Sequence, residues 1–174
     1  MQQVTNNILM IRPVSFRMNE QTAVNNYYQK VLDNLTPEMV QKKALKEFKD
    51  LVIKLDDVGV NVIVVKDTDF PDTPDSIFPN NWVSFHASGK ICLFPMYAEN
   101  RRVERRKDIF DTLKYKYFFL VNDIIDLTYF EKENKFQEVL IIKYDAEHKG
   151  GTAFKLGKAA DFTAKLVNYT LTDH

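Results

Sequence analysis

Short apolar runs alternate with longer amphipathic stretches along the first half of the chain. Residues 8–13 form an apolar run closed by a proline, which predicts a buried strand that ends where the chain turns. Residues 60–65 form a second run, rich in β-branched residues, which is typical of an interior strand. The stretch between them has helical character, so the order strand, helix, strand predicts a βαβ unit.

The helix between these strands carries clear boundary signals. Thr36 is suited to the N-cap, Pro37 to the first helical position, and Gly59 to the end of the helix. A shorter stretch before it, residues 19–32, also has helical character. The main helix is expected to bury one apolar face, formed by Val40, Ala44, Phe48, Leu51, Val52 and Leu55.

The next part of the chain continues this alternation. Residues 82–94 predict a hairpin in which Ser88 and Gly89 supply the turn. Residues 99–114 predict a second amphipathic helix, and residues 117–121 predict the strand that follows it. The second helix is expected to bury Val103, Phe110 and Leu113.

Weaker strand signals lie at residues 139–142 and 162–169, separated by a glycine-containing stretch. No coiled-coil heptad, low-complexity tract or interdomain linker interrupts the order of elements. With 174 residues, 45% of them hydrophobic, the chain is long enough for one domain with a sizeable core. The sequence therefore predicts an α/β fold and a single domain over residues 1–174.

The charges balance, with 24 basic and 24 acidic residues, so the sequence predicts neither a nucleic-acid nor a membrane partner. The single cysteine, Cys92, excludes an internal disulfide framework and fits the reducing cytoplasm. No apolar run approaches the roughly 18 residues of a membrane span, and the N-terminus has no signal-peptide pattern. His86, His148 and His174 lack metal-binding spacing, so neither a metal nor a cofactor is expected.

The most unusual stretch, residues 71–85, reads PDTPDSIFPNNWVSF. It follows the carboxyl end of a predicted core strand, which is where open α/β folds commonly bind ligands. Its polar side chains Asp72, Asp75, Asn80 and Asn81 are hydrogen-bond acceptors suited to a planar cation such as a guanidinium. Composition alone favours the alternative that proline, aspartate and asparagine simply build turns here.

Two further features carry candidate chemistry. Four arginines lie within residues 101–106, where they either pair with a carboxylate or phosphate or form a solvated face with neighbouring acids. Cys92 lies inside an apolar strand, and we interpret it as a small buried hydrophobe rather than a nucleophile. Neither feature assigns a reaction by itself.

Three segments together resemble the guanidine-modifying superfamily of arginine deiminases, dimethylarginine hydrolases and amidinotransferases. They read ILMIRPVSFRMNEQTAVNNYYQ, TPDSIFPNNWVSFH and NRRVERRKDI, and the resemblance extends over residues 7–138. Its nearest branch is that of the amidinotransferase-like citrulline-utilisation hydrolases. The resemblance implies a pentein-type, pseudo-fivefold α/β propeller of ββαβ modules. It also implies cysteine-dependent C–N chemistry on a small guanidino or ureido substrate, with a histidine as acid and base.

The same resemblance assigns roles to residues of this chain. Asp75, Phe78 and Asn81 would line the guanidine side of the substrate, with Asn80 beside them in the motif. Arg102 would hold the substrate carboxylate. The polar loop would therefore be a substrate-cation loop.

Glu138 would be the catalytic acid that orients the guanidinium, and the chain departs from the superfamily directly after it. In the superfamily this glutamate is followed by glycine with threonine or a second glycine, and later by the catalytic histidine and cysteine. This chain reads EVLIIKYDAEHKGG and ends at His174. We therefore expect a divergent tail at residues 139–174, an incomplete propeller and a catalytically incomplete chain. A truncated, a rearranged and a frameshifted end are all compatible with this tail.

Two functional hypotheses follow from the sequence. The first is a cytoplasmic guanidine hydrolase or amidinotransferase that acts on an arginine- or citrulline-like molecule. The second is a non-enzymatic fragment or degenerate paralogue that keeps the substrate loop and serves as a binding or oligomerisation partner. Sheet edges left uncovered by missing modules would favour association with another chain, a second copy included.

Overall fold

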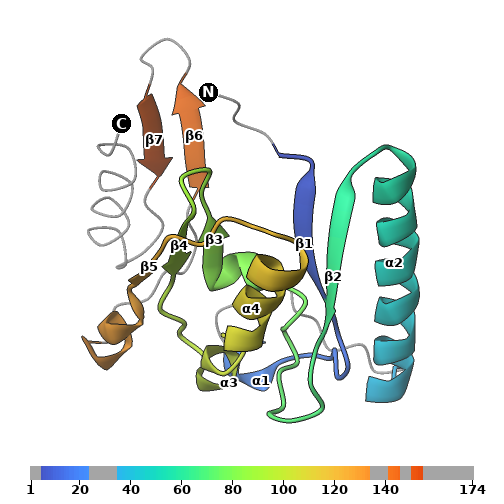
Figure 1. Ribbon diagram of the computed structural model, residues 1–174. Coiled ribbons are helices and arrows are strands. Elements are labelled where there is room, and N and C mark those ends of the chain that lie inside the picture. Colours follow the sequence, from blue (N-terminus) through green and yellow to red (C-terminus); the bar gives the residue numbers. More distant parts are fainter. Residues whose placement is uncertain (1–4, 24–34, 134–140, 146–149, 155–174) are drawn as a thin grey trace.

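The computed structural model describes residues 5–23, 35–133, 141–145 and 150–154 and shows a mixed α/β arrangement (Figure 1). The strands form a two-stranded parallel sheet, a three-stranded mixed sheet and a two-stranded antiparallel pair. The predicted α/β class is confirmed. Within the described part of the chain, no helix is long and apolar enough to cross a membrane.

Strands β1 (Asn7–Arg12) and β2 (Asn61–Lys66) pair in parallel and are joined through helix α2 (Pro37–Asp57). The predicted βαβ unit is therefore confirmed, and Figure 1 shows α2 beside β2. The helix begins where its sequence signals place it, since the Thr36 hydroxyl accepts the Met39 N–H at 3.3 Å. This cap satisfies one of the backbone donors that a helix leaves free at its start.

The apolar face of α2 is narrower than predicted. Ala44 and Phe48 are buried as expected, but Leu51 is 47% exposed. A two-stranded sheet covers only a thin stripe of a long helix, so positions that drift from that stripe along successive turns face solvent.

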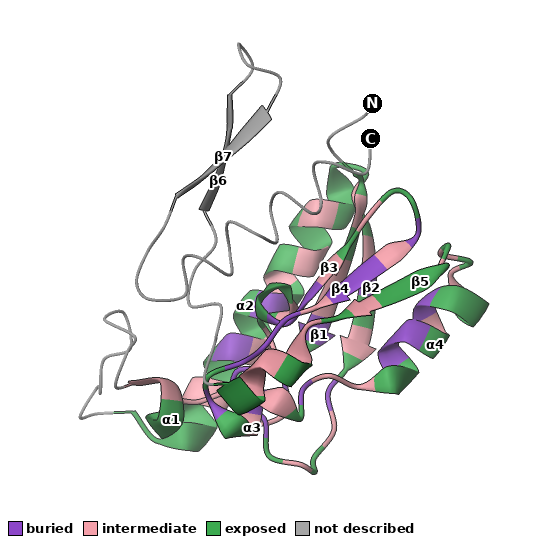
Figure 2. Cartoon of the chain, turned by 90° about the vertical axis from the view of Figure 1, so that its left-hand side faces the viewer, coloured by how far each residue is buried: buried purple, intermediate pink, exposed green. Residues whose placement is uncertain are grey.

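A second unit follows in the order hairpin, helix, strand. Strands β3 (Val83–Phe85) and β4 (Lys90–Leu93) form the predicted hairpin, and its turn contains Gly89 with a positive φ of 81°. Helix α4 (Lys107–Lys116) leads to β5 (Asp123–Asp126), which pairs in parallel with β4. Figure 2 shows β4 largely buried between β3 and the more exposed β5.

The strand predicted at residues 117–121 is wrong, because the strand that joins the sheet begins at Asp123. The chain reverses after α4, where Phe118 adopts a left-handed φ of 57° and the Phe119 N–H donates to the Leu113 carbonyl oxygen at 3.0 Å. The apolar residues of this stretch therefore pack as a helix-ending loop against the core.

The single helix predicted over residues 99–114 is also wrong. It is broken into α3 (Glu99–Arg102) and α4, with Val103 46% exposed at the break rather than buried. The Arg106 N–H donates to the Glu104 carbonyl oxygen at 2.8 Å, a tight turn that ends helical pairing. The break turns Arg101 and Glu104 into the interior.

The remaining predictions have mixed outcomes. The described part of the helix predicted at residues 19–32 is confirmed, and the strand predicted at 139–142 is confirmed from Ile141 onward. The strand predicted at 162–169 lies outside the described residues. The remaining elements are α1 (Glu20–Ala23), the short 3-10 helices η1 (Pro79–Asn81) and η2 (Thr128–Glu133), β6 (Ile141–Asp145) and β7 (Gly150–Phe154).

One apolar core connects the two larger sheets. It takes side chains from β1, β2, the hairpin and α4. Among them is Trp82, which is 1% exposed and lies edge-on to Phe110, with 6.1 Å between the ring centroids. The buried members are Ile11, Ile63, Trp82, Val83, Ile91, Met96, Ile109, Phe110 and Leu113. The polar loop at 71–81 therefore leads directly into this core.

Replacing Ile63 with alanine should lower the free energy of unfolding by about 2–5 kcal/mol, because its side chain is 1% exposed and its removal leaves a cavity. The matched control is Ile53→Ala on α2, where the same side chain is 47% exposed and the change should stay within about 0.5 kcal/mol. Urea unfolding followed by circular dichroism measures both. Equal losses in the two variants would contradict the assigned core.

Candidate functional site

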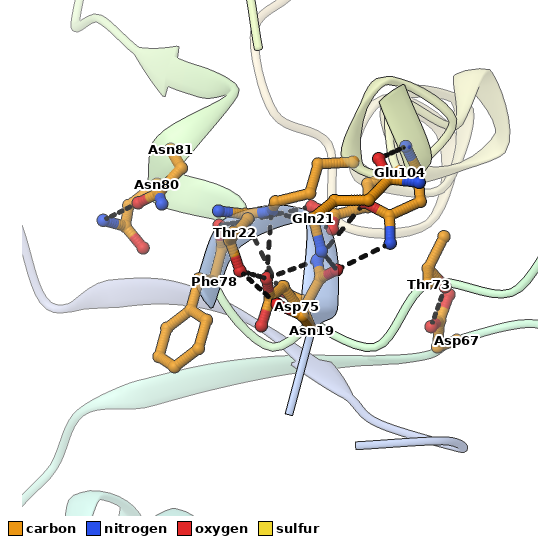
Figure 3. A network of polar contacts seen from close by, with 12 residues as sticks. Asn19, Gln21, Thr22, Asp67, Thr73, Asp75, Phe78, Asn80, Asn81 and Glu104 are labelled. Atoms are coloured by element: carbon orange, nitrogen blue, oxygen red, sulfur yellow. Dashed lines mark hydrogen bonds and ion pairs between the residues drawn. The ribbon is translucent and has the colours of Figure 1, made fainter. Parts of the chain in front are cut away.

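The carboxylate of Asp75 lies inside the polar loop and is 4% exposed. Its Oδ2 accepts hydrogen bonds from the Asn19 amide at 2.8 Å and from the Thr22 hydroxyl at 3.2 Å. Asn19 and Asn100 in turn exchange a pair of side-chain hydrogen bonds at 3.2 and 2.8 Å. Figure 3 shows how the start of α1 and the loop meet around Asp75.

A buried arginine completes this network. Arg101 is 5% exposed, and its Nη2 donates to the carbonyl oxygens of Asp75 at 3.4 Å and Phe78 at 3.2 Å. Nε and the same Nη2 donate to the two oxygens of Glu104, at 3.0 and 3.1 Å. The Asp75 carboxylate lies 3.9 Å from Arg101 Nε. Buried charges need such partners, so the loop and α3 are held together electrostatically.

The start of the loop is fixed by separate contacts. The Thr73 hydroxyl donates to Asp67 at 2.7 Å, and Arg106 donates to the other oxygen of Asp67 at 3.4 Å. Arg17 pairs with Asp72, which lowers the pKa of that carboxyl and raises the pKa of the Arg17 guanidinium. Polar contacts thus hold the loop at several points along its length.

The other side of the loop faces solvent. Phe78 is 44% exposed, Asn80 and Asn81 are exposed, and the Asn80 amide donates to Asn81 Oδ1 at 3.0 Å. Phe16 packs edge-on against Phe78, with ring centroids 6.4 Å apart. Amide oxygens accept hydrogen bonds from a planar cation, and an aromatic face attracts one, so this surface offers two kinds of contact to a guanidinium.

Arg102 lies in a different setting from the loop. It donates to the carbonyl oxygens of Met96 at 2.9 Å and Tyr97 at 3.2 Å. It lines a cavity of about 550 Å³ whose other lining residues are Asp126, Thr128, Tyr129, Glu131 and Lys132. The contact with Asp75 is made instead by the preceding residue, Arg101.

Four of the predicted site residues lie in this one loop. Asp75 is buried, and Phe78, Asn80 and Asn81 are exposed. The lining of the Arg102 cavity includes none of these four. Glu138 lies outside the described residues.

The sequence patterns did not identify Asn19, Arg101 and Glu104 as parts of the loop's support. All three are polar residues that are 2–5% exposed. One available signal was the spacing of Arg101 and Glu104, since residues three apart on a helical turn face each other. The contact between Asn19 and Asp75 spans 56 positions and has no local signal.

Cys92 is 1% exposed, and its Sγ lies 3.5 Å from His86 Nε2, which in turn lies 3.1 Å from the Ser84 hydroxyl. Burial raises the pKa of the Cys92 thiol and lowers the pKa of the His86 imidazole. Both shifts favour a neutral pair at neutral pH rather than a thiolate beside an imidazolium. Among the described residues, no three His, Cys, Asp or Glu side chains are grouped to hold a metal ion.

Burial also raises the pKa of Glu104, to about 7, against the opposing effect of Arg101. Asp75 and Asp67 add to the rise because their negative charges disfavour a third carboxylate nearby. The network beneath the loop therefore contains one acid that titrates near neutral pH.

Comparison with known proteins gives one match. The model of a family described as N,N dimethylarginine dimethylhydrolase, eukaryotic, matches residues 12–149, which is most of the chain. The match includes the polar loop, α3 and α4. Neither the comparison with curated proteins nor that with solved structures finds a match.

Glu104→Gln should change how stability depends on pH. The pKa of Glu104 is raised in the folded state from 4.5 to about 7, so its contribution is fully present below pH 4.5 and is lost as pH rises through 7. Relative to Glu104→Gln, wild type should therefore lose roughly 1–3 kcal/mol of unfolding free energy between pH 4.5 and 8. Urea unfolding across this range measures it. Glu99→Gln, on an 82%-exposed side chain of α3, is the control and should show no such trend; parallel curves for wild type and Glu104→Gln would contradict the assignment.

Proposed function

Because the chain belongs to the N,N-dimethylarginine dimethylhydrolase family, and so to the guanidine-modifying superfamily, we propose that its loop at residues 75–81 binds an arginine-like small molecule. The observation that carries this proposal is a loop fixed by polar contacts. It presents the ring of Phe78 and the amides of Asn80 and Asn81 to solvent, while the carboxylate of Asp75 is buried. The name of the family puts methylated arginines first among the candidate ligands. Citrulline and arginine come second, on the resemblance of the motifs.

Each predicted residue has a role in this proposal. Phe78 contacts the flat face of the guanidinium, and Asn80 and Asn81 accept hydrogen bonds from its edge. Asp75 supplies negative charge beneath the loop and anchors it. Arg102, which shares its cavity with Lys132, would hold the ligand carboxylate, as the superfamily motif implies.

Glu138 would orient the guanidinium, as the superfamily motif implies. We also propose that the hairpin, α4 and β5 are one ββαβ module of a pseudo-fivefold propeller, because they follow one another in that order and β5 pairs with β4. The βαβ unit of β1, α2 and β2 would belong to a neighbouring module. In the three-stranded sheet β5 is one of the two edges, and further modules or a second chain would join there.

Binding and hydrolysis are separable in this chain. Hydrolysis of a guanidinium through a covalent intermediate needs a thiolate aimed at the planar carbon. Cys92 is buried in β4, and the pKa of its thiol is raised, so it is held as the unreactive thiol. We therefore propose that the described part of the chain binds the ligand without turning it over, which favours the binding-protein hypothesis for activity and the hydrolase family for ancestry.

Asn81→Ala should weaken binding of asymmetric dimethylarginine about tenfold, because a hydrogen bond to a charged group contributes roughly 1.5 kcal/mol or more. Isothermal titration calorimetry with dimethylarginine, arginine and citrulline measures the affinities. Asn61→Ala is the control, since Asn61 is an exposed asparagine of β2 that bonds Asn7. Equal effects of the two substitutions, or no binding by wild type, would defeat the proposal.

The purified chain should release neither dimethylamine, ammonia nor urea from dimethylarginine, arginine, agmatine or citrulline. The reason is that the thiol of Cys92 stays protonated at neutral pH. Product release is measured for wild type and for Cys92→Ala. Turnover that disappears in Cys92→Ala would make Cys92 the nucleophile, and turnover that persists would require another mechanism; either result contradicts the expectation.

A further inference from the structure

One guanidinium lies across a turn of the candidate loop. The Phe78 N–H donates to the Asp75 carbonyl oxygen at 3.0 Å, which closes a turn over residues 75–78. Arg101 Nη2 donates to the carbonyl oxygens at both ends of this turn, at 3.4 Å and 3.2 Å. A single side chain therefore fixes the first and last residues of the turn relative to each other.

The guanidinium is itself held rigidly. Glu104 accepts from Nε at 3.0 Å and from Nη2 at 3.1 Å, and the side chains of Arg101 and Glu104 are only 6% and 1% exposed. A bidentate pair of this kind sets the plane of the guanidinium as well as its position. The direction of these donors toward the loop is thus set by Glu104, which follows α3 in the chain.

We propose that Arg101 is a positioning residue that holds the loop in the form in which Phe78, Asn80 and Asn81 face a ligand. This inference rests on the proposed function for the meaning of the exposed face, but not for the contact itself. Arg101 is turned inward beneath the loop and acts through the backbone of Asp75 and Phe78. Lysine would keep the charge but lose the planar fork that reaches two carbonyls and a carboxylate together.

Trp82 provides a built-in reporter of the loop. It is the only tryptophan in the chain, it is 1% exposed, and it directly follows the exposed asparagines. The backbone N–H of Trp82 donates to the Pro79 carbonyl oxygen at 3.0 Å, so this residue ends the 3-10 turn that carries Asn80 and Asn81. Loosening of the loop should therefore expose the indole to a soluble quencher.

The experiment compares Arg101→Lys with Arg12→Lys in the full chain. Arg12 is the control because it is an exposed arginine at the end of β1, outside the loop at residues 71–81, so the same substitution is made on the surface. Three quantities are measured for each protein: the Kd for asymmetric dimethylarginine, acrylamide quenching of Trp82, and the urea midpoint. Glu104→Gln at pH 8 is a second test, since it leaves Arg101 in place but removes one acceptor of the fork.

We expect Arg101→Lys to raise the Kd about tenfold, as for the loss of one charge-assisted hydrogen bond, and to raise acrylamide quenching. Arg12→Lys should change the Kd less than about twofold. Should Arg101→Lys fail to fold, Glu104→Gln decides, and it should raise both the Kd and the quenching. The inference is overturned when Kd and quenching in the folded Arg101 or Glu104 variant match wild type, or when Arg12→Lys changes them equally.

If the wild-type protein binds no guanidino ligand, the proposed function is wrong. The role of Arg101 in holding the loop is then tested by acrylamide quenching of Trp82 alone. Increased quenching in Arg101→Lys alone would then still support the clamp on the loop. Unchanged quenching would overturn it.

Discussion

A carboxylate that is only 4% exposed must find partners inside the protein, and the pairing of Asp75 organises everything around it. Asn19 and Thr22 reach it from the start of α1, and Arg101 reaches it from α3, so three segments far apart in sequence are drawn to one point. An unpaired buried charge would cost several kcal/mol, a large fraction of the stability of a domain this size. The break between α3 and α4 follows from the same requirement, because it turns Arg101 and Glu104 inward rather than along an exposed helix face.

The apolar core and the polar network support each other across Trp82. The indole packs among β1, β2 and α4, while its backbone closes the 3-10 turn that ends the loop. Burial of the core determines where the end of the loop lies, and Arg101 determines the course of its middle. A surface that is fixed in this way loses little conformational freedom when it binds a ligand, which is the general advantage of preorganised sites.

The sequence predicted the elements whose signals are local. The cap at Thr36, the β-branched strand at residues 60–65 and the Ser88-Gly89 turn each depend on a few neighbouring residues, and each appears where expected. It failed where distant contacts decide. Phe119 and Val121 were predicted to lie in a strand, but they pack against the core from a loop. Arg101 was predicted to lie on a solvated or ligand-binding face, but it is buried. Resemblance to known motifs identified the loop residues themselves. Only the folded structure shows that Asp75 is buried while Asn81 is exposed.

The hairpin of β3 and β4 places the thiol of Cys92 in a setting that is unsuited to nucleophilic chemistry. Its side chains alternate between two faces, so Val83 and Ile91 enter the core while Ser84 and Cys92 lie opposite. That second face is apolar around Cys92, with Phe94, Ile125 and Leu127, and an apolar setting stabilises the protonated thiol. A thiolate would need the reverse, a partly exposed and electropositive setting. The packing that keeps β4 buried thus works against nucleophilic chemistry at Cys92. The loop that precedes β3 does not depend on this thiol.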